Sequence, residues 1–165
     1  MLVLGIDPGS HTTGWGVVRS VPGKLHHVAS GVIAARGDIP ERLRQIADGL
    51  DALLVEHGPA QVSIESLYHH KNSQSALKLG QARGVALLSV ARCGADLFEY
   101  APAEIKRAAT GNGRAPKELV ARMVRMILGY HGELPLDASD ALAAAICHAQ
   151  RGRLVPAAPP RRVAP

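Results

Sequence analysis

The spacing of apolar residues changes along the chain, from a strand-like pattern in the first 35 residues to helical spacing later. Residues 1–6 (MLVLGI) form a short apolar run, which predicts a buried strand. Residues 13–20 (TGWGVVRS) and 24–35 (KLHHVASGVIAA) are rich in β-branched residues, and a Val-Pro-Gly turn signal separates them. The beginning of the chain therefore predicts three consecutive antiparallel strands.

Helical spacing begins after residue 40 and alternates with further strand-like segments. Residues 41–56 place their leucines and Ile46 on one stripe, as expected of an amphipathic helix. Residues 74–92 are apolar almost all round, which predicts a long helix buried on two sides. The remaining expected elements are strands at 61–66 and 96–101 and helices at 102–109, 117–128 and 137–150.

The order of these elements predicts an α/β fold. Three antiparallel strands followed by alternating helices and strands indicate a five-stranded mixed sheet, with three antiparallel and two parallel strands and helices on both faces. The 165 residues suit one domain, which we expect at residues 1–151. Residues 152–165 are dominated by Pro, Ala and Arg, and we expect a disordered tail there.

Composition narrows the class of protein. Apolar residues make up 47% of the chain and aromatic residues only 3%, so the core must be aliphatic and rich in alanine. The two cysteines, Cys93 and Cys147, are too few for a disulfide framework, which favours a reducing, cytoplasmic location. We expect no membrane contact, because the chain has no signal-peptide pattern and no apolar run of about 18 residues.

Positive charge is concentrated in two parts of the chain. The net charge is +5, but residues 66–130 alone carry ten Lys and Arg against four acids. Residues 151–165 carry four arginines and no acid. A phosphate backbone would suit this distribution. On charge alone, a solvated helix face and a basic tail explain it equally well.

Four carboxylates fall at the ends of predicted elements. Asp7 ends the first strand, Glu65 ends the fourth, and Asp137 and Asp140 share one face at the start of the last helix. If the first and fourth strands are neighbours, all four can meet at one sheet edge. Converging carboxylates repel one another unless cations lie between them, and hard oxygen ligands favour Mg²⁺ or Mn²⁺. Two such ions could hydrolyse a phosphodiester bond.

Each acid also has a plainer interpretation when it is taken alone. Asp137 and Asp140 could simply be favourable charges at a helix N-terminus. Glu65 could be a solvated residue at a strand end, and Asp7 could be a turn former before Pro-Gly.

The loop after Glu65 is a candidate DNA contact. Tyr68 offers an aromatic face for base stacking, and His70, Lys71 and Asn72 offer polar groups beside it. A tyrosine packed in the core and a polar surface loop are the alternative interpretation.

A second candidate DNA contact surrounds the Gly-rich loop at residues 110–114. Lys106 and Lys117 flank this loop and Arg114 lies in it, so that together they could follow a phosphate backbone. Solvated surface residues would have the same pattern.

Gly80 and Gly84 lie four residues apart in the predicted helix at 74–92. Glycine destabilises a helix interior by about 1 kcal/mol relative to alanine, so close approach of another backbone is a reason to place it there. That backbone could belong to a second copy of the chain or to the chain's own sheet.

Several motifs together resemble one known family. The segments GIDPGSHTTGWGVV, SIES, ALKLGQARGVAL, EYAPAEIKRAATGNGRAPKELV and DASDALAAAI follow in order from the start of the chain to about residue 150. As an ordered set they resemble the RuvC family of Holliday-junction resolvases.

The resemblance implies a ribonuclease-H-like fold and a homodimer paired through the helix at 74–92. It implies an endonuclease that resolves four-way DNA junctions in recombination and repair, using Mg²⁺ or Mn²⁺ with two ions per active site. Paired, symmetric nicks would leave 5′-phosphate ends that a ligase can seal. The branch-migration proteins RuvA and RuvB are the partners that the family implies.

The family's functional positions can be matched to residues of this chain. Asp7, Glu65, Asp137 and Asp140 match its acidic metal-binding positions, although the position of Asp137 is a histidine in some relatives. The match also assigns DNA binding and catalysis to Lys106 and Lys117, and base stacking near the crossover to Tyr68.

Other functions remain compatible with parts of the pattern. A non-catalytic junction-binding module could retain the same fold, and a related nuclease could act on other branched DNA or on RNA. An actin-like ATPase also begins with an Asp-containing strand and a glycine turn, but 165 residues leave no room for its second lobe.

Overall fold

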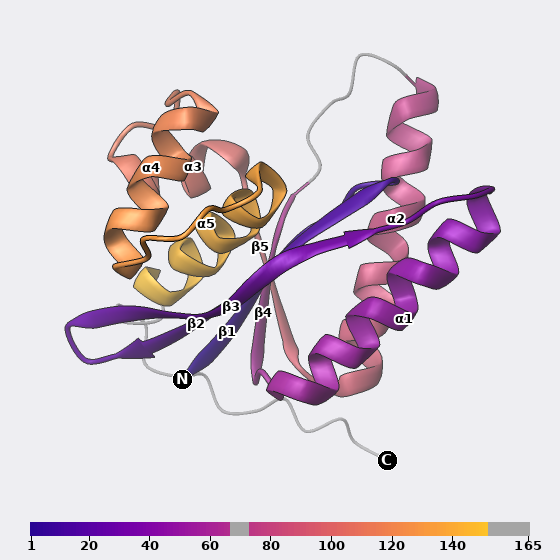
Figure 1. Ribbon diagram of the computed structural model, residues 1–165, viewed down its shortest axis with the longest axis horizontal. Helices are drawn as coiled ribbons and strands as arrows, with labels where there is room; N and C mark the ends of the chain where they lie inside the picture. The colour runs from indigo at the N-terminus through magenta and orange to yellow at the C-terminus, as the bar shows by residue number, and fades with distance from the viewer. Residues whose placement is uncertain (67–72, 152–165) are drawn as a thin grey trace.

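A mixed β-sheet organises the molecule and confirms the predicted strand arrangement (Figure 1). The computed structural model describes residues 1–66 and 73–151. The strands are β1 (Leu2–Asp7), β2 (Thr12–Val21), β3 (Lys24–Ala34), β4 (Gln61–Glu65) and β5 (Asp96–Tyr100). They lie in the order β3-β2-β1-β4-β5. The first three pair antiparallel, whereas β4 pairs parallel with both β1 and β5.

Helices cover both faces of the sheet, so the described residues form three layers (Figure 1). One face is covered by α1 (Ile39–His57) and α2 (Ser73–Cys93). The other face is covered by α3 (Pro102–Thr110), α4 (Lys117–Leu128) and α5 (Leu136–Arg151). Every predicted helix and strand is present, and its ends lie within two residues of the predicted ones. None of the helices described here has the length and apolar character needed to cross a membrane.

Local signals explain where α1 begins and ends. The Asp38 side chain accepts a hydrogen bond from the backbone N–H of Glu41 at 3.0 Å, which caps the first turn. Gly58 ends the helix in the left-handed region, with φ 52°, where glycine has no steric penalty.

One prediction about α2 is wrong for the single chain. The sequence predicts burial on two sides, but the structure buries one side, including Ala82, Ala86 and Val90. On the other side, Leu77 and Leu88 are 65% and 50% exposed. The spacing of apolar residues indicates which sides of a helix favour burial. It does not indicate whether residues of the same chain cover those sides.

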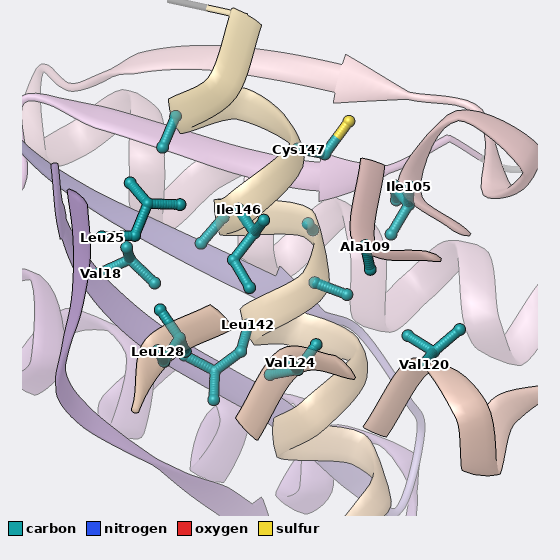
Figure 2. Close-up of a cluster of buried hydrophobic side chains, with 14 of the residues drawn as sticks. Val18, Leu25, Ile105, Ala109, Val120, Val124, Leu128, Leu142, Ile146 and Cys147 are labelled. Atoms are coloured by element: carbon teal, nitrogen blue, oxygen red, sulfur yellow. The ribbon is translucent and has the colours of Figure 1, made fainter. Parts of the chain in front are cut away.

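The helix α5 lies at the centre of one core (Figure 2). Leu142, Ile146 and Cys147 of α5 face residues of the strands and of α3 and α4. Its alanines are buried as well, which agrees with the predicted aliphatic, alanine-rich core. Buried on so many sides, α5 is held firmly against the sheet.

Glycines on the sheet allow α5 to approach it closely. A Cβ atom on Gly5 would overlap the backbone carbonyl of Ala141, and one on Gly14 would overlap the backbone carbonyl of Asp137. The helix backbone therefore rests directly on β1 and β2. At its other end His148 is buried, and its ring nitrogens contact the Tyr100 hydroxyl at 2.6 Å and the Gln61 side-chain oxygen at 2.9 Å.

Candidate active site

Two carboxylates lie side by side at the carboxyl ends of adjacent strands. Asp7 ends β1 and Glu65 ends β4, and these strands pair in register up to Ile6 and Ile64. Those two isoleucines point into the core under α1 and α2. Because side chains alternate along a strand, Asp7 and Glu65 both face the α5 side of the sheet. The predicted neighbourhood of the first and fourth strands is confirmed.

The first turns of α5 bring two more carboxylates to this sheet edge. The Asp137 backbone touches β2 at Gly14, which is the residue paired with Asp7. Asp140 follows on the same face of the helix and lines the same cleft as Asp7 and Glu65. The close contact between helix and sheet thus sets the position of the acids.

The electrostatic environment of Asp7 is unfavourable for a negative charge. Burial is the largest cause, followed by the neighbouring charges of Asp140, Glu65 and Asp137, and together they raise the pKa of Asp7 from 3.8 to about 7. Lys117 partly opposes this increase. A cation with more charge at this point would stabilise the ionised carboxylate.

Lys117 forms an ion pair with one of the acids. Its Nζ atom donates a hydrogen bond to Oδ2 of Asp140 at 2.8 Å. The side chains are 62% and 20% exposed, so the pair lies at the edge of the cleft and is accessible to solvent. The bond to Asp140 raises the pKa of Lys117, which keeps the ammonium charged.

The acids open into a cleft of about 340 Å³. Its walls combine Asp7, Glu65 and Asp140 with Lys106 and Lys117, and apolar residues of α2, α3 and α4 complete the lining. Carboxylates beside lysines in one cleft can serve both a metal ion and a phosphate group.

The donor set fits a hard divalent cation. Carboxylate oxygens are the ligands that Mg²⁺ and Mn²⁺ prefer. The raised pKa of Asp7 reflects burial together with the negative charge of its neighbours. In residues 1–66 and 73–151, no three His, Cys, Asp or Glu side chains yet converge as metal ligands.

Other predicted residues lie outside the cleft or outside the described residues. Asp137 is half-buried beside the cleft and contributes to the pKa of Asp7, but it does not line the cavity. Arg114 is exposed in the loop before α4 and does not line it either. The predicted DNA contacts that fall outside the described residues are Tyr68, His70, Lys71 and Asn72.

Two residues that line the cleft, Arg83 and Ser66, were not predicted from the sequence. Arg83 lines the cleft, although the sequence pattern predicts only that it belongs to a helix. Ser66, which also lines it, donates its hydroxyl to the Tyr100 carbonyl at 3.1 Å. A buried arginine has no periodic signal of its own, so only the surrounding fold reveals it.

Comparison with known proteins decides the family. Residues 3–148 match the family model described as crossover junction endodeoxyribonuclease RuvC. The chain belongs to the RuvC family. The RuvC of Anaeromyxobacter dehalogenans is 52% identical over 167 residues, which cover 99% of this chain and 89% of that protein. The RuvC of Myxococcus xanthus is 48% identical, with 96% of this chain and 85% of that protein covered.

Solved structures confirm the fold. The RuvC of Thermus thermophilus matches with a TM-score of 0.84 and 33% identity, covering 93% of this chain and 96% of that one. The same protein in complex with its Holliday junction substrate matches with the same TM-score and 32% identity, again covering 93% and 96% of the two chains. The yeast mitochondrial resolvase Ydc2, at 15% identity and a TM-score of 0.63, shares the fold across 90% of this chain and 77% of its own. The family, the ribonuclease-H-like fold and the enzyme class, a crossover junction endodeoxyribonuclease, are thus confirmed for this RuvC chain.

Proposed function

We propose that this RuvC enzyme resolves four-way DNA junctions by hydrolysing a phosphodiester bond in the cleft that contains Asp7. One observation carries the proposal: burial and the neighbouring carboxylates together raise the pKa of Asp7 to about 7, in a cleft that also contains Lys106 and Lys117. Carboxylates with strongly raised pKa values in a cleft are typical of functional sites.

The metal ligands in this proposal are Asp7, Glu65, Asp137 and Asp140. Two bound Mg²⁺ or Mn²⁺ ions would supply Lewis-acid activation of water and of the scissile phosphate. Asp7 would lose its proton and bind as a carboxylate. Lys117, released from Asp140, would then be free to donate to a phosphate oxygen, with Lys106 beside it. In this proposal the acids bind the metal ions and the lysines bind the phosphate, which explains why both kinds of residue line one cleft.

Further DNA contacts are assigned from the family match at Tyr68 and from the residue types of the two loops at the other positions. We propose that the DNA strand near the crossover point of the junction contacts Tyr68, His70, Lys71 and Asn72. An arm of the junction would contact Arg114. Arg114 is exposed beside the start of α4, which is compatible with this role.

The same proposal includes a homodimer paired through α2. Leu77 and Leu88 are exposed on this helix, and among the described residues nothing lies within 4 Å of a Cβ built on Gly80 or Gly84. The close approach that would justify these glycines is therefore not made by residues 1–66 or 73–151 of the same chain. Two copies related by a two-fold axis would offer one cleft to each of the two strands that must be cut.

The remaining assignments follow from the family. We assign the nuclease domain to residues 1–151 and the branch-migration partners to RuvA and RuvB. Location in the cytoplasm agrees with a DNA substrate and with bacterial relatives such as that of Myxococcus xanthus. In this proposal the protein acts together with RuvA and RuvB in homologous recombination and DNA repair.

The experiment that tests the proposal is cleavage of a synthetic four-way junction in Mg²⁺, with the cut ends mapped. The wild type is expected to make paired symmetric nicks with 5′-phosphate ends and to leave a linear duplex intact. Asp7→Asn should lower cleavage by at least about 100-fold. Replacing even a residue that only supports a metal ligand typically lowers metal affinity or activity by about 10–100-fold. Junction binding should be retained.

The matched control is Asp96→Asn, which removes an exposed carboxylate from the start of β5. It should cleave like the wild type. Full activity of Asp7→Asn would contradict the assignment of the cleft, and binding without any cleavage by the wild type would instead favour a non-catalytic module.

A further inference from the structure

Arg83 is a buried arginine on α2 that reaches the edge of the sheet. It is 8% exposed and lines the cleft that contains Asp7 and Glu65. Arginine is almost never buried without partners, so its contacts indicate what it does.

Both outer nitrogens of the Arg83 guanidinium are engaged by neighbouring strands. One donates a hydrogen bond to the backbone carbonyl of Glu65 at 2.6 Å. The other pairs with the Glu99 carboxylate at 2.7 Å. The planar fork thus ties α2 to the ends of β4 and β5 at once, a geometry that lysine cannot reproduce.

The bonded carbonyl lies where strand pairing ends. Glu65 and Tyr100 form the last pair between β4 and β5, and the next residue, Ser66, bonds to the Tyr100 carbonyl. On the other side of β4, pairing with β1 already ends at Ile64. The orientation of the Glu65 carboxylate therefore depends on contacts such as the one from Arg83.

We propose that Arg83 is a positioning residue, which holds the Glu65 backbone so that its carboxylate is presented to a divalent cation. This inference rests on the proposed function, in which Glu65 is a metal ligand. Residues behind metal ligands typically change metal affinity by about 10–100-fold when they are replaced. The competing role is direct binding of a DNA phosphate, because Arg83 also lines the cleft.

The first test is Arg83→Lys, which keeps the charge but cannot span both partners. Positioning predicts that half-maximal cleavage needs about 10-fold more Mg²⁺. It also predicts a smaller Mg²⁺-induced rise in the melting temperature of the DNA-free protein, and junction affinity in EDTA equal to that of the wild type. Arg92→Lys is the matched control, because Arg92 lies on the same helix in an exposed ion pair with Asp51 at 4.0 Å.

The second test, Glu99→Gln, separates the two roles by the direction of the effect. If Arg83 is a positioning residue, cleavage and melting temperature should both respond more weakly to Mg²⁺, because Arg83 loses its ion pair with Glu99. Junction affinity should be unchanged. Phosphate binding predicts tighter junction binding, because Arg83 is freed from a competing carboxylate. Glu99 is 47% exposed, so this variant is expected to fold even if Arg83→Lys does not.

Three outcomes would overturn the inference: a loss of junction affinity in Arg83→Lys, tighter junction binding in Glu99→Gln, or a wild-type Mg²⁺ response in both variants. A wild type that binds Mg²⁺ but cuts no junction would contradict the proposed function instead. In that case the Mg²⁺-dependent melting shift still reports whether Arg83 positions a cation ligand.

Discussion

Asp7 combines a rigid backbone with an unfavourable charge. It ends a buried strand, and burial together with Asp140, Glu65 and Asp137 raises its pKa to about 7. Burial and repulsion together destabilise the folded protein when Asp7 is ionised, and a bound cation would offset both. The same residue should therefore lower stability in the absence of metal and be required for activity in its presence.

The pKa of Asp7 predicts a pH-dependent stability. Between about pH 4 and 7 the folded state holds a proton that the unfolded state has lost, so stability falls as pH rises through this window. Asp7→Asn should remove this contribution and give a higher melting temperature than the wild type at pH 7.5 without metal. Near pH 4 the two proteins should differ less.

Thermal unfolding in EDTA across this pH range checks the prediction, with Asp96→Asn as the exposed control. Mg²⁺ at pH 7.5 should stabilise the wild type more than Asp7→Asn. A wild-type melting temperature that rises from pH 4 to 7.5 relative to the variant would contradict the raised pKa.

The two cleft lysines are expected to contact phosphates. Lys106→Ala and Lys117→Ala should weaken junction binding and each reduce the slope of log K against log salt by about 1, because one fewer counterion is released. Arg44→Ala is the control, since Arg44 pairs with Asp48 on α1, the helix that covers the opposite face of the sheet. Salt titrations of junction binding measure the slopes, and unchanged slopes would exclude these lysines as phosphate contacts.

At the scale of elements, α5 determines where two of the acids lie. The helix is packed against the sheet, α3 and α4, and its backbone touches β1 and β2 at glycines. Alanine-rich packing of this kind permits little displacement without loss of contacts. The position of Asp137 and Asp140 is therefore sensitive to small changes in the strands beneath them.

Replacing Gly14 tests this sensitivity. The new Cβ of Gly14→Ala would overlap the Asp137 backbone, so we expect a destabilisation of about 1–3 kcal/mol and a displaced first turn of α5. Cleavage should fall more than junction binding does. The control is Ala34→Val, which adds carbon atoms at an exposed position of β3. It should change neither the stability of the protein nor its cleavage of the junction.

Chemical denaturation measures the loss of stability, and cleavage at a temperature where the variant is fully folded measures activity. A folded Gly14→Ala variant with wild-type cleavage would show that α5 can shift without moving its carboxylates.

At the scale of the whole molecule, the two sides of α2 have different surroundings. One side packs against the chain's own core and carries Arg83 toward the cleft. The other side exposes Leu77 and Leu88 and has open space above Gly84. If two copies pair there, dimerisation places the helix that supports Glu65 at the interface.

Gly84→Arg is predicted to give a folded monomer. A Cβ atom at this position meets nothing within 4 Å among the described residues, whereas an arginine side chain would block the approach of a second helix. Val55→Arg is the control, because Val55 is 85% exposed on α1. Sedimentation velocity should show a dimer for the wild type and for the control. Unchanged dimerisation of Gly84→Arg would exclude this face of α2 as the interface.

Local sequence pattern was sufficient for much of the architecture. Apolar periodicity predicted each strand and helix to within two residues, because the two periods depend only on nearby residues. The expected neighbourhood of the first and fourth strands, which the structure confirms, placed Asp7 beside Glu65 at one edge. The motifs around these acids were also sufficient to indicate the family, because their order along the chain is specific.

Only the tertiary structure decided what surrounds those acids. The ion pair of Lys117 with Asp140, the fork of Arg83 and the raised pKa of Asp7 each join residues from different elements. The exposed side of α2 also became visible only once its neighbours were in place. Periodicity records which side chains avoid water, whereas burial and charge at a point depend on distances between segments that are remote in sequence.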